Sequence, residues 1–143
     1  MTSIVEYMTS QHRFCDNSFA AAEIAVSEKN WSEAEKQWGV FRRDLEIHLI
    51  NEEETLFPAF EQISGNAAGP PAVMRMEHLQ MRGMVESMTE ALQAKAADGY
   101  LNLSETLMIL MQQHNMKEEQ MLYPMTQQML PDTAAVISSM NDL

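Results

Sequence analysis

The sequence predicts an all-α fold, an up-down-up-down four-helix bundle with a short C-terminal fifth helix. Three observations favour this fold. In four long segments, apolar residues recur at alternating steps of three and four, a spacing that keeps side chains on one helix face. The five glycines and five prolines cluster where turns are needed. A pattern in the first half, with histidines at positions 12 and 48, recurs 66 residues later at positions 78 and 114.

The first two helices are separated near Lys29–Asn30–Trp31, where the first helix should end. Ser32 and Glu35 then form a capping box, in which the serine oxygen and the glutamate satisfy backbone amides of a new first turn. Pro58 should kink or end the second helix. The inward stripe of the first helix is Met8, His12, Cys15, Phe19, Ala22 and Val26, and that of the second is Trp38, Phe41, Leu45, His48, Glu52 and Leu56.

The third helix follows the clearest linker of the chain, Gly65 to Pro71, whose two prolines suit a helix start. Asp98–Gly99 marks the next turn, and Asn102 resembles the N-cap of the fourth helix. Pro124 should kink or end that helix, and a short fifth helix is expected over Thr133 to Met140. Short connections make neighbouring helices antiparallel. The inward stripes are Met74, His78, Met81, Val85, Met88 and Leu92, then Leu103, Leu107, Leu110 or Met111, His114, Glu118, Met121 and Met125.

Composition predicts one domain over residues 1–143, in the cytoplasm. Apolar residues make up 45% of the chain, enough for a real core, yet no stretch is long and apolar enough to span a membrane. The N-terminus lacks the pattern of a signal peptide, and Cys15 is the one cysteine, which fits a reducing interior. The net charge of −12 disfavours nucleic acid and anionic membranes as partners.

Six polar residues lie on otherwise apolar stripes: His12, His48, Glu52, His78, His114 and Glu118. Each glutamate follows a histidine by four residues, so the pair shares one helix face. Burying an unpaired carboxylate costs about several kcal/mol, and metal ions would remove that cost while binding imidazole lone pairs. A hydrogen-bonded network without metal is the structural alternative. Imidazole and carboxylate without thiolate suit iron, manganese or zinc, and six ligands related by a repeat fit two ions better than one.

The motifs that carry a family resemblance are His12, His48-x-x-x-Glu52-Glu53 followed by Leu-Phe-Pro, His78, and His114-x-x-x-Glu118-Glu119 followed by Leu-Tyr-Pro. In these features the chain resembles the hemerythrin-like family, also called the HHE cation-binding domain, over nearly its whole length. The resemblance implies a pair of non-haem iron ions with oxo or hydroxo and carboxylate bridges. It also implies binding of dioxygen, nitric oxide or peroxide.

The chain departs from oxygen-carrying hemerythrins where they have a second histidine on the third helix, because Arg82 stands there. It is therefore similar to the four-histidine subgroup, which includes iron-sulfur repair proteins and iron or oxygen sensors. Oxygen carriers space the last histidine and carboxylate by five, which would select Glu119, whereas internal symmetry with Glu52 favours Glu118. Glu53 and Glu119 otherwise read as flanking or solvent residues.

The sequence leaves three functions open. The first is a metal protein that binds dioxygen or a related small ligand for sensing, storage or protection. The second is a di-iron protein that turns over peroxide or nitric oxide or repairs iron-sulfur clusters, so the sequence does not decide whether the protein is an enzyme. The third is a signalling module. Asp16 and Arg82 occupy equivalent positions in the repeat and are expected to pair at the mouth of the site, and Cys15 is interpreted as a small buried hydrophobe or a redox thiol.

Overall fold

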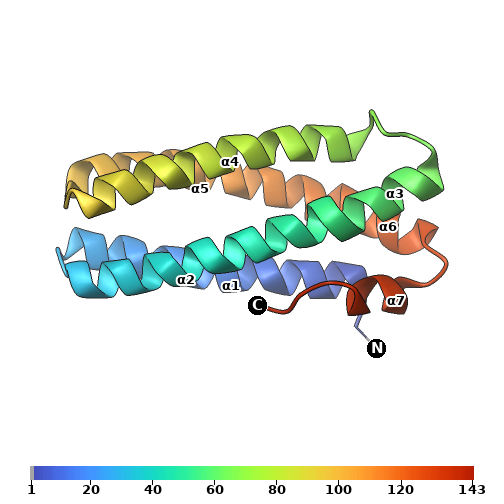
Figure 1. Ribbon diagram of the computed structural model, residues 1–143, viewed down its shortest axis with the longest axis horizontal. Coiled ribbons are helices and arrows are strands. Elements are labelled where there is room, and N and C mark those ends of the chain that lie inside the picture. Colours follow the sequence, from blue (N-terminus) through green and yellow to red (C-terminus); the bar gives the residue numbers. More distant parts are fainter. Residues whose placement is uncertain (1) are drawn as a thin grey trace.

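A computed structural model describes residues 2–143, and within that range every regular element is a helix. The four long helices are α1 (Ile4–Ser27), α2 (Trp31–Ile50), α4 (Pro70–Gln93) and α5 (Ala97–Lys117). The shorter segments are η1 (Asn51–Leu56), α3 (Phe57–Ser64), η2 (Glu118–Leu122), α6 (Tyr123–Met129) and α7 (Thr133–Ser138). This confirms the predicted all-α bundle with a short fifth helix (Figure 1).

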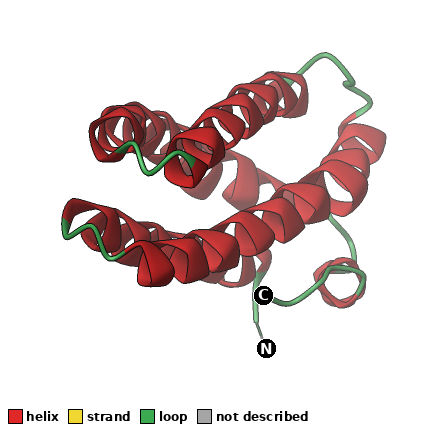
Figure 2. Ribbon diagram, turned by 60° about the vertical axis from the view of Figure 1, so that its left-hand side comes forward, coloured by secondary structure: helices red, strands yellow, loops and turns green. Residues whose placement is uncertain are grey.

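The bundle consists of two helical hairpins packed face to face. Helices α1 and α2 form one hairpin, and α4 and α5 form the other, with the linker after α3 connecting them (Figures 1 and 2). Each hairpin is antiparallel because its connecting turn is only a few residues long. The two hairpins meet mainly where α1 packs on α5 and α6, and where α2 packs on α4.

The core is divided into two apolar clusters that occupy opposite ends of the bundle. The cluster at the hairpin turns is built around the aromatic side chains of Phe19, Trp38, Phe41 and Tyr100. The cluster at the other end contains Ile4, Met8, Leu56, Phe57, Phe60, Met74, Leu122, Tyr123 and Met140. In α1 and α4 the histidine lies between residues of the two clusters, and in α2 and α5 it lies near the end of the helix, before the segments that supply the second cluster. A polar layer is therefore enclosed by apolar packing on both sides.

Two helix starts differ from the sequence expectation. The N-cap of α2 is Asn30, whose side chain accepts from the backbone amide of Glu33, so Ser32 lies inside the first turn. Helix α5 begins at Ala97, and Asn102 is therefore an interior residue. The actual turn precedes it at Lys95, which has a φ of 54°. Both turns contain a residue with positive φ, Lys29 and Lys95, and each lies two residues before the start of the helix that follows.

The two prolines of the repeat do not end their helices. Instead a wide π-helical segment precedes each one, η1 before Pro58 and η2 before Pro124, and the chain continues as α3 and α6. A proline inside a helix lacks an amide hydrogen and collides with the carbonyl four residues earlier. An inserted π turn relieves that collision. Because Glu52 and Glu118 lie in these segments, the widened turns also set the positions of both carboxylates.

The end of the chain lies against the first hairpin. After α7, the backbone amide of Asn141 donates to Asn51 Oδ1, and its carbonyl accepts from Gln11 Nε2 and Asn51 Nδ2. Tyr7 donates its hydroxyl proton to Asp142. This tail therefore packs beside the polar layer. Over residues 2–143, none of the helices has both the length and the hydrophobicity that crossing a bilayer requires.

Candidate metal centre

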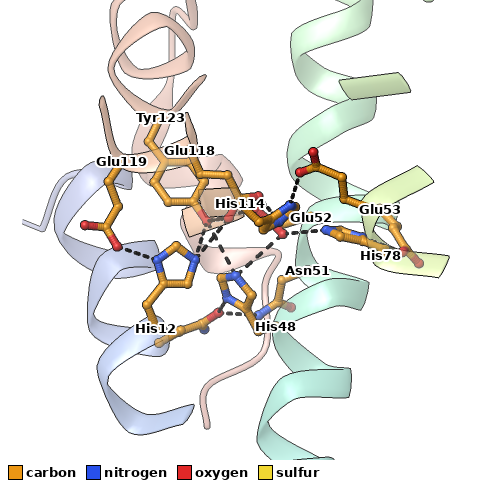
Figure 3. A network of polar contacts seen from close by, with 12 residues as sticks. His12, His48, Asn51, Glu52, Glu53, His78, His114, Glu118, Glu119 and Tyr123 are labelled. Atoms are coloured by element: carbon orange, nitrogen blue, oxygen red, sulfur yellow. Dashed lines mark hydrogen bonds and ion pairs between the residues drawn. The ribbon is translucent and has the colours of Figure 1, made fainter. Parts of the chain in front are cut away.

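The six polar residues singled out in the sequence meet in the middle of the bundle. Each of them is at most 4% exposed. The four histidines come from α1, α2, α4 and α5, one per helix, and the two glutamates come from η1 and η2 (Figure 3). The six inner residues are His12, His48, His78, His114, Glu52 and Glu118.

Each carboxylate joins the two hairpins. Glu52 Oε1 lies 3.1 Å from His78 Nε2 and 3.5 Å from His48 Nε2. Glu118 lies 3.1 Å from His114 Nε2 through Oε2, and 3.1 Å from His12 Nε2 through Oε1. Every glutamate thus touches the histidine four residues before it and one histidine of the opposite hairpin. All four Nε2 atoms point into the same space.

Two of the histidines are held from outside by glutamates of the opposite hairpin. His12 Nδ1 donates to Glu119 Oε2 at 2.6 Å, and His78 Nδ1 donates to Glu53 Oε2 at 2.6 Å. Glu118 therefore faces the centre, whereas Glu119 lies behind His12. The sequence interpretation of Glu53 and Glu119 as flanking residues missed this role. Their recurrence directly after Glu52 and Glu118 in the repeat was the available signal.

The other two histidines donate to residues that directly precede a histidine in the sequence, namely Gln11 before His12 and Glu77 before His78. His48 Nδ1 donates to Gln11 Oε1 at 2.8 Å, and His114 Nδ1 donates to Glu77 Oε1 at 2.7 Å. An acceptor at each Nδ1 places a ring proton there, so a ring that is neutral directs its Nε2 lone pair inward. Burial, with a further contribution from nearby charged His12, lowers the pKa of His48 well below its usual value, which keeps that ring neutral. Neutral imidazole with an inward lone pair is the form that binds metals.

Arg82 does not pair with Asp16 as expected. Its guanidinium donates to Glu53 at 2.7 Å and to Glu46 at 2.9 Å, both on the hairpin opposite to its own. Arg82 therefore supports the glutamate that holds His78 rather than closing the mouth of the site. Asp16 lies instead along the cavity beside His12.

Tyr123 places its hydroxyl among these groups, which the sequence did not reveal. The oxygen lies 2.8 Å from Glu52 Oε2 and 2.9 Å from Glu118 Oε1. It also lies 3.1 Å from His12 Nε2 and 3.5 Å from His48 Nε2 (Figure 3). Phe57 occupies the equivalent position of the repeat and stacks on His78, with ring centroids 5.6 Å apart.

The two inner carboxylates have pKa values that are shifted in opposite directions. Burial, followed by repulsion from Glu118, raises the pKa of Glu52 well above its usual range. Burial acts in the same direction on Glu118, but the charge of His114 and hydrogen bonds outweigh it and lower the pKa of Glu118 well below its usual range. Burial and then the two carboxylates raise the pKa of Tyr123 well above its usual value. A cation at this position would neutralise what the side chains leave unbalanced.

The donor set fits metal ions because buried polar atoms of this centre lack hydrogen-bond partners. Of the six such atoms within residues 2–143, four belong to this centre: Glu52 Oε1, His78 Nε2, His114 Nε2 and Glu118 Oε2. Orphaned buried polar atoms are uncommon and call for an explanation such as an ion. The ligand atoms fall into two close groups, one of Glu52, His78, His114 and Glu118, the other of His12, His48 and Glu118.

A small cavity adjoins the second of these groups. Its volume is about 10 Å³, and the residues along it include His12, Cys15, Asp16, His48 and His114. A cavity of about 10–15 Å³ accommodates one water molecule. Burial raises the pKa of Cys15 to about 12, so its thiol stays protonated and packs as an apolar group.

Comparisons with known proteins agree with the donor set. A family model described as Hemerythrin HHE cation binding domain matches residues 3–126. No curated protein and no solved structure matches the chain. The matched range contains all six inner residues and all four residues that hold the outer nitrogens of the histidines.

Proposed function

Because this chain belongs to the hemerythrin HHE cation-binding domain family, we propose that it is a non-haem di-iron protein that binds dioxygen or a related small ligand such as nitric oxide or peroxide. The observation that carries the proposal is the convergence of unpaired buried nitrogen and oxygen atoms from both hairpins. Imidazole nitrogen with carboxylate oxygen is a donor set that iron accepts. Manganese and zinc remain the competing ions.

In this proposal each hairpin contributes one pair of histidines. His78 and His114 hold one ion, His12 and His48 hold the other, and the carboxylates of Glu52 and Glu118 span them. The outer acceptors fix each ring so that its Nε2 lone pair faces an ion. Glu118 belongs to both ligand groups, which makes it the principal bridge.

The surroundings of the centre suit a small uncharged ligand. Bound iron would supply reversible electron transfer and an open coordination position. The protein supplies a cavity of about 10 Å³ beside His12 and His48, which admits a molecule about the size of water and excludes organic substrates. The Cys15 and Met81 side chains make its wall apolar. A reducing cytoplasm is the expected location, consistent with the unpaired thiol of Cys15.

Metal analysis of protein purified from its native host tests the proposal. We expect about two irons per chain and near-ultraviolet absorption that changes on reduction and on re-exposure to air. Ligands that bind only the folded state also stabilise it. Removing iron with a chelator should therefore lower the melting temperature. One zinc per chain, or no metal with unchanged melting, would reject the di-iron function.

The variant His114→Ala refines this test, because it removes one inner nitrogen. It should lose iron and melt at a lower temperature than wild type. Gln113→Ala, at an exposed neighbouring position, is the matched control and should keep both properties. Full iron content in His114→Ala would exclude that histidine as a ligand.

A further inference from the structure

We propose that Tyr123 is a seventh protein ligand of this centre, bound through its phenol oxygen to the ion that His12 and His48 hold. The assignment rests on the proposed di-iron function and goes beyond it, because the six ligands expected from the sequence do not include a tyrosine. The phenol loses its proton to solvent as the oxygen binds the ion. The two ions then differ chemically, one with a phenolate ligand and one without.

The distances around Tyr123 match those between neighbouring ligands of one ion. Ligand atoms bound at about 2.1 Å and at right angles to one another are about 3 Å apart. Tyr123 Oη, His12 Nε2 and Glu118 Oε1 form a triangle with sides of 3.1, 2.9 and 3.1 Å. These three atoms therefore have the spacing of one face of an octahedral coordination shell.

Hydrogen bonding alone does not account for these contacts. A tyrosine hydroxyl donates one proton, yet the oxygen of Tyr123 has two carboxylate oxygens at 2.8 and 2.9 Å and two imidazole nitrogens at 3.1 and 3.5 Å. His48 is neutral and its Nδ1 donates to Gln11, so its Nε2 presents a lone pair. One hydroxyl proton cannot serve two carboxylates and this nitrogen. A cation among them would.

The other hairpin provides the comparison within the molecule. Phe57 stands at the repeat position of Tyr123, is fully buried, and stacks on His78 without a polar atom near the centre. Phenylalanine thus fits the same helical position in the same fold. Tyr123→Phe should therefore fold, which makes the loss of the hydroxyl a clean change.

Spectroscopy of the iron(III)-loaded protein tests the ligand directly. A phenolate on iron(III) gives visible charge-transfer absorption and resonance-enhanced tyrosine ring vibrations in the Raman spectrum. We expect both in wild type and neither in Tyr123→Phe. The variant should also bind its second iron about 10–100-fold more weakly, a loss like that seen when a group supporting a metal site is removed.

The chain contains only three tyrosines, which permits a matched control. The double variant Tyr7→Phe/Tyr100→Phe leaves Tyr123 as the one tyrosine. Tyr100 lies in the distant apolar cluster and its buried hydroxyl makes no hydrogen bond within residues 2–143. The double variant should keep the absorption and Raman features of wild type, which assigns them to Tyr123 even if Tyr123→Phe does not fold.

The outcomes separate this inference from the proposed function. Wild type that loads two irons but lacks phenolate features overturns the role of Tyr123 and leaves the di-iron function standing. Tyr123 is likewise excluded as a ligand if Tyr123→Phe retains those features or the double variant loses them. Wild type that takes up no iron overturns the di-iron function, and this ligand assignment falls with it.

Discussion

The two halves of the bundle hold their histidines with the same geometry but surround them with different charges. His12 and His78 each donate at 2.6 Å to a glutamate of the opposite hairpin. His48 and His114 each donate, at 2.8 and 2.7 Å, to the residue that precedes a histidine on the neighbouring helix. The inner frame is therefore repeated in the two halves down to individual contacts.

The partners behind this frame differ in charge. In the first half, Gln11 accepts from His48 and from the amide of Asn51. In the second half, Glu77 accepts from His114 and pairs with Lys117 at 2.5 Å. A neutral amide pair thus corresponds to an ion pair at equivalent positions of the repeat.

The outer acceptors of the two halves thus hold the rings in the same geometry but differ in charge. A carboxylate behind a histidine makes the ring a stronger donor than an amide does. The ion held by His78 and His114 should accordingly receive more electron density from its histidines. With Tyr123 present in one half and Phe57 in the other, a symmetric frame would hold two dissimilar ions.

The largest expected effect on metal binding comes from replacing the inner carboxylates, because Glu118 belongs to both ligand groups and Glu52 to one. Glu118→Ala should abolish binding of both ions, since Glu118 belongs to both ligand groups, whereas Glu52→Ala should weaken the ion held by His12 and His48 less than the other ion, since Glu52 belongs to one group. At a metal concentration of about 1,000 times Kd, loss of one ion removes about 4 kcal/mol of stabilisation. Iron content per chain and thermal unfolding measure both. Equal losses in the two variants would contradict the unequal grouping.

A smaller effect is expected from exchanging the charge behind His114. Glu77→Gln makes the second half resemble the first and should weaken the ion held by His78 and His114 about tenfold. Competition with a chelator measures that affinity. Lys117→Ala is the matched control: it removes the ion pair with Glu77 but keeps the acceptor of His114, so affinity should hardly change. An equal loss in both variants would show that the ion pair, not the acceptor, matters.

The smallest expected effect concerns Arg82. Its guanidinium pairs with Glu53 and Glu46 near the surface, and such partly exposed pairs contribute about 0.2–1 kcal/mol. Arg82→Gln should lower the free energy of unfolding by about that amount, measured by urea denaturation. Asp16→Asn, at the equivalent repeat position, removes no ion pair with Arg82 and should leave the contacts of Glu53 intact. If Arg82→Gln lowers the free energy of unfolding by more than about 2 kcal/mol, the position of His78 depends on Arg82 through Glu53 more strongly than proposed.

The fold and the inner residues could be predicted because both depend on spacing along one helix. A histidine and a glutamate four residues apart must share a face, whatever packs against it. The outer partners depend on contacts between helices, which spacing does not specify. Glu119 reaches His12 across the two hairpins. The π-helical turns add a second difficulty, since they shift the faces of the residues that follow them, Tyr123 among them.

The tail at the end of the chain determines which way one amide is turned. Asn141 offers its carbonyl to Gln11 Nε2 at 3.1 Å, so the oxygen of that amide must face His48. Were the amide flipped, its NH₂ would confront Nδ1, and the ring would shift its proton to Nε2 and lose the lone pair that grips metal. The contact between Asn141 and Gln11 therefore determines which nitrogen of the buried His48 ring carries the proton. A change that breaks the contact between Asn141 and Gln11 should therefore weaken metal binding at His48.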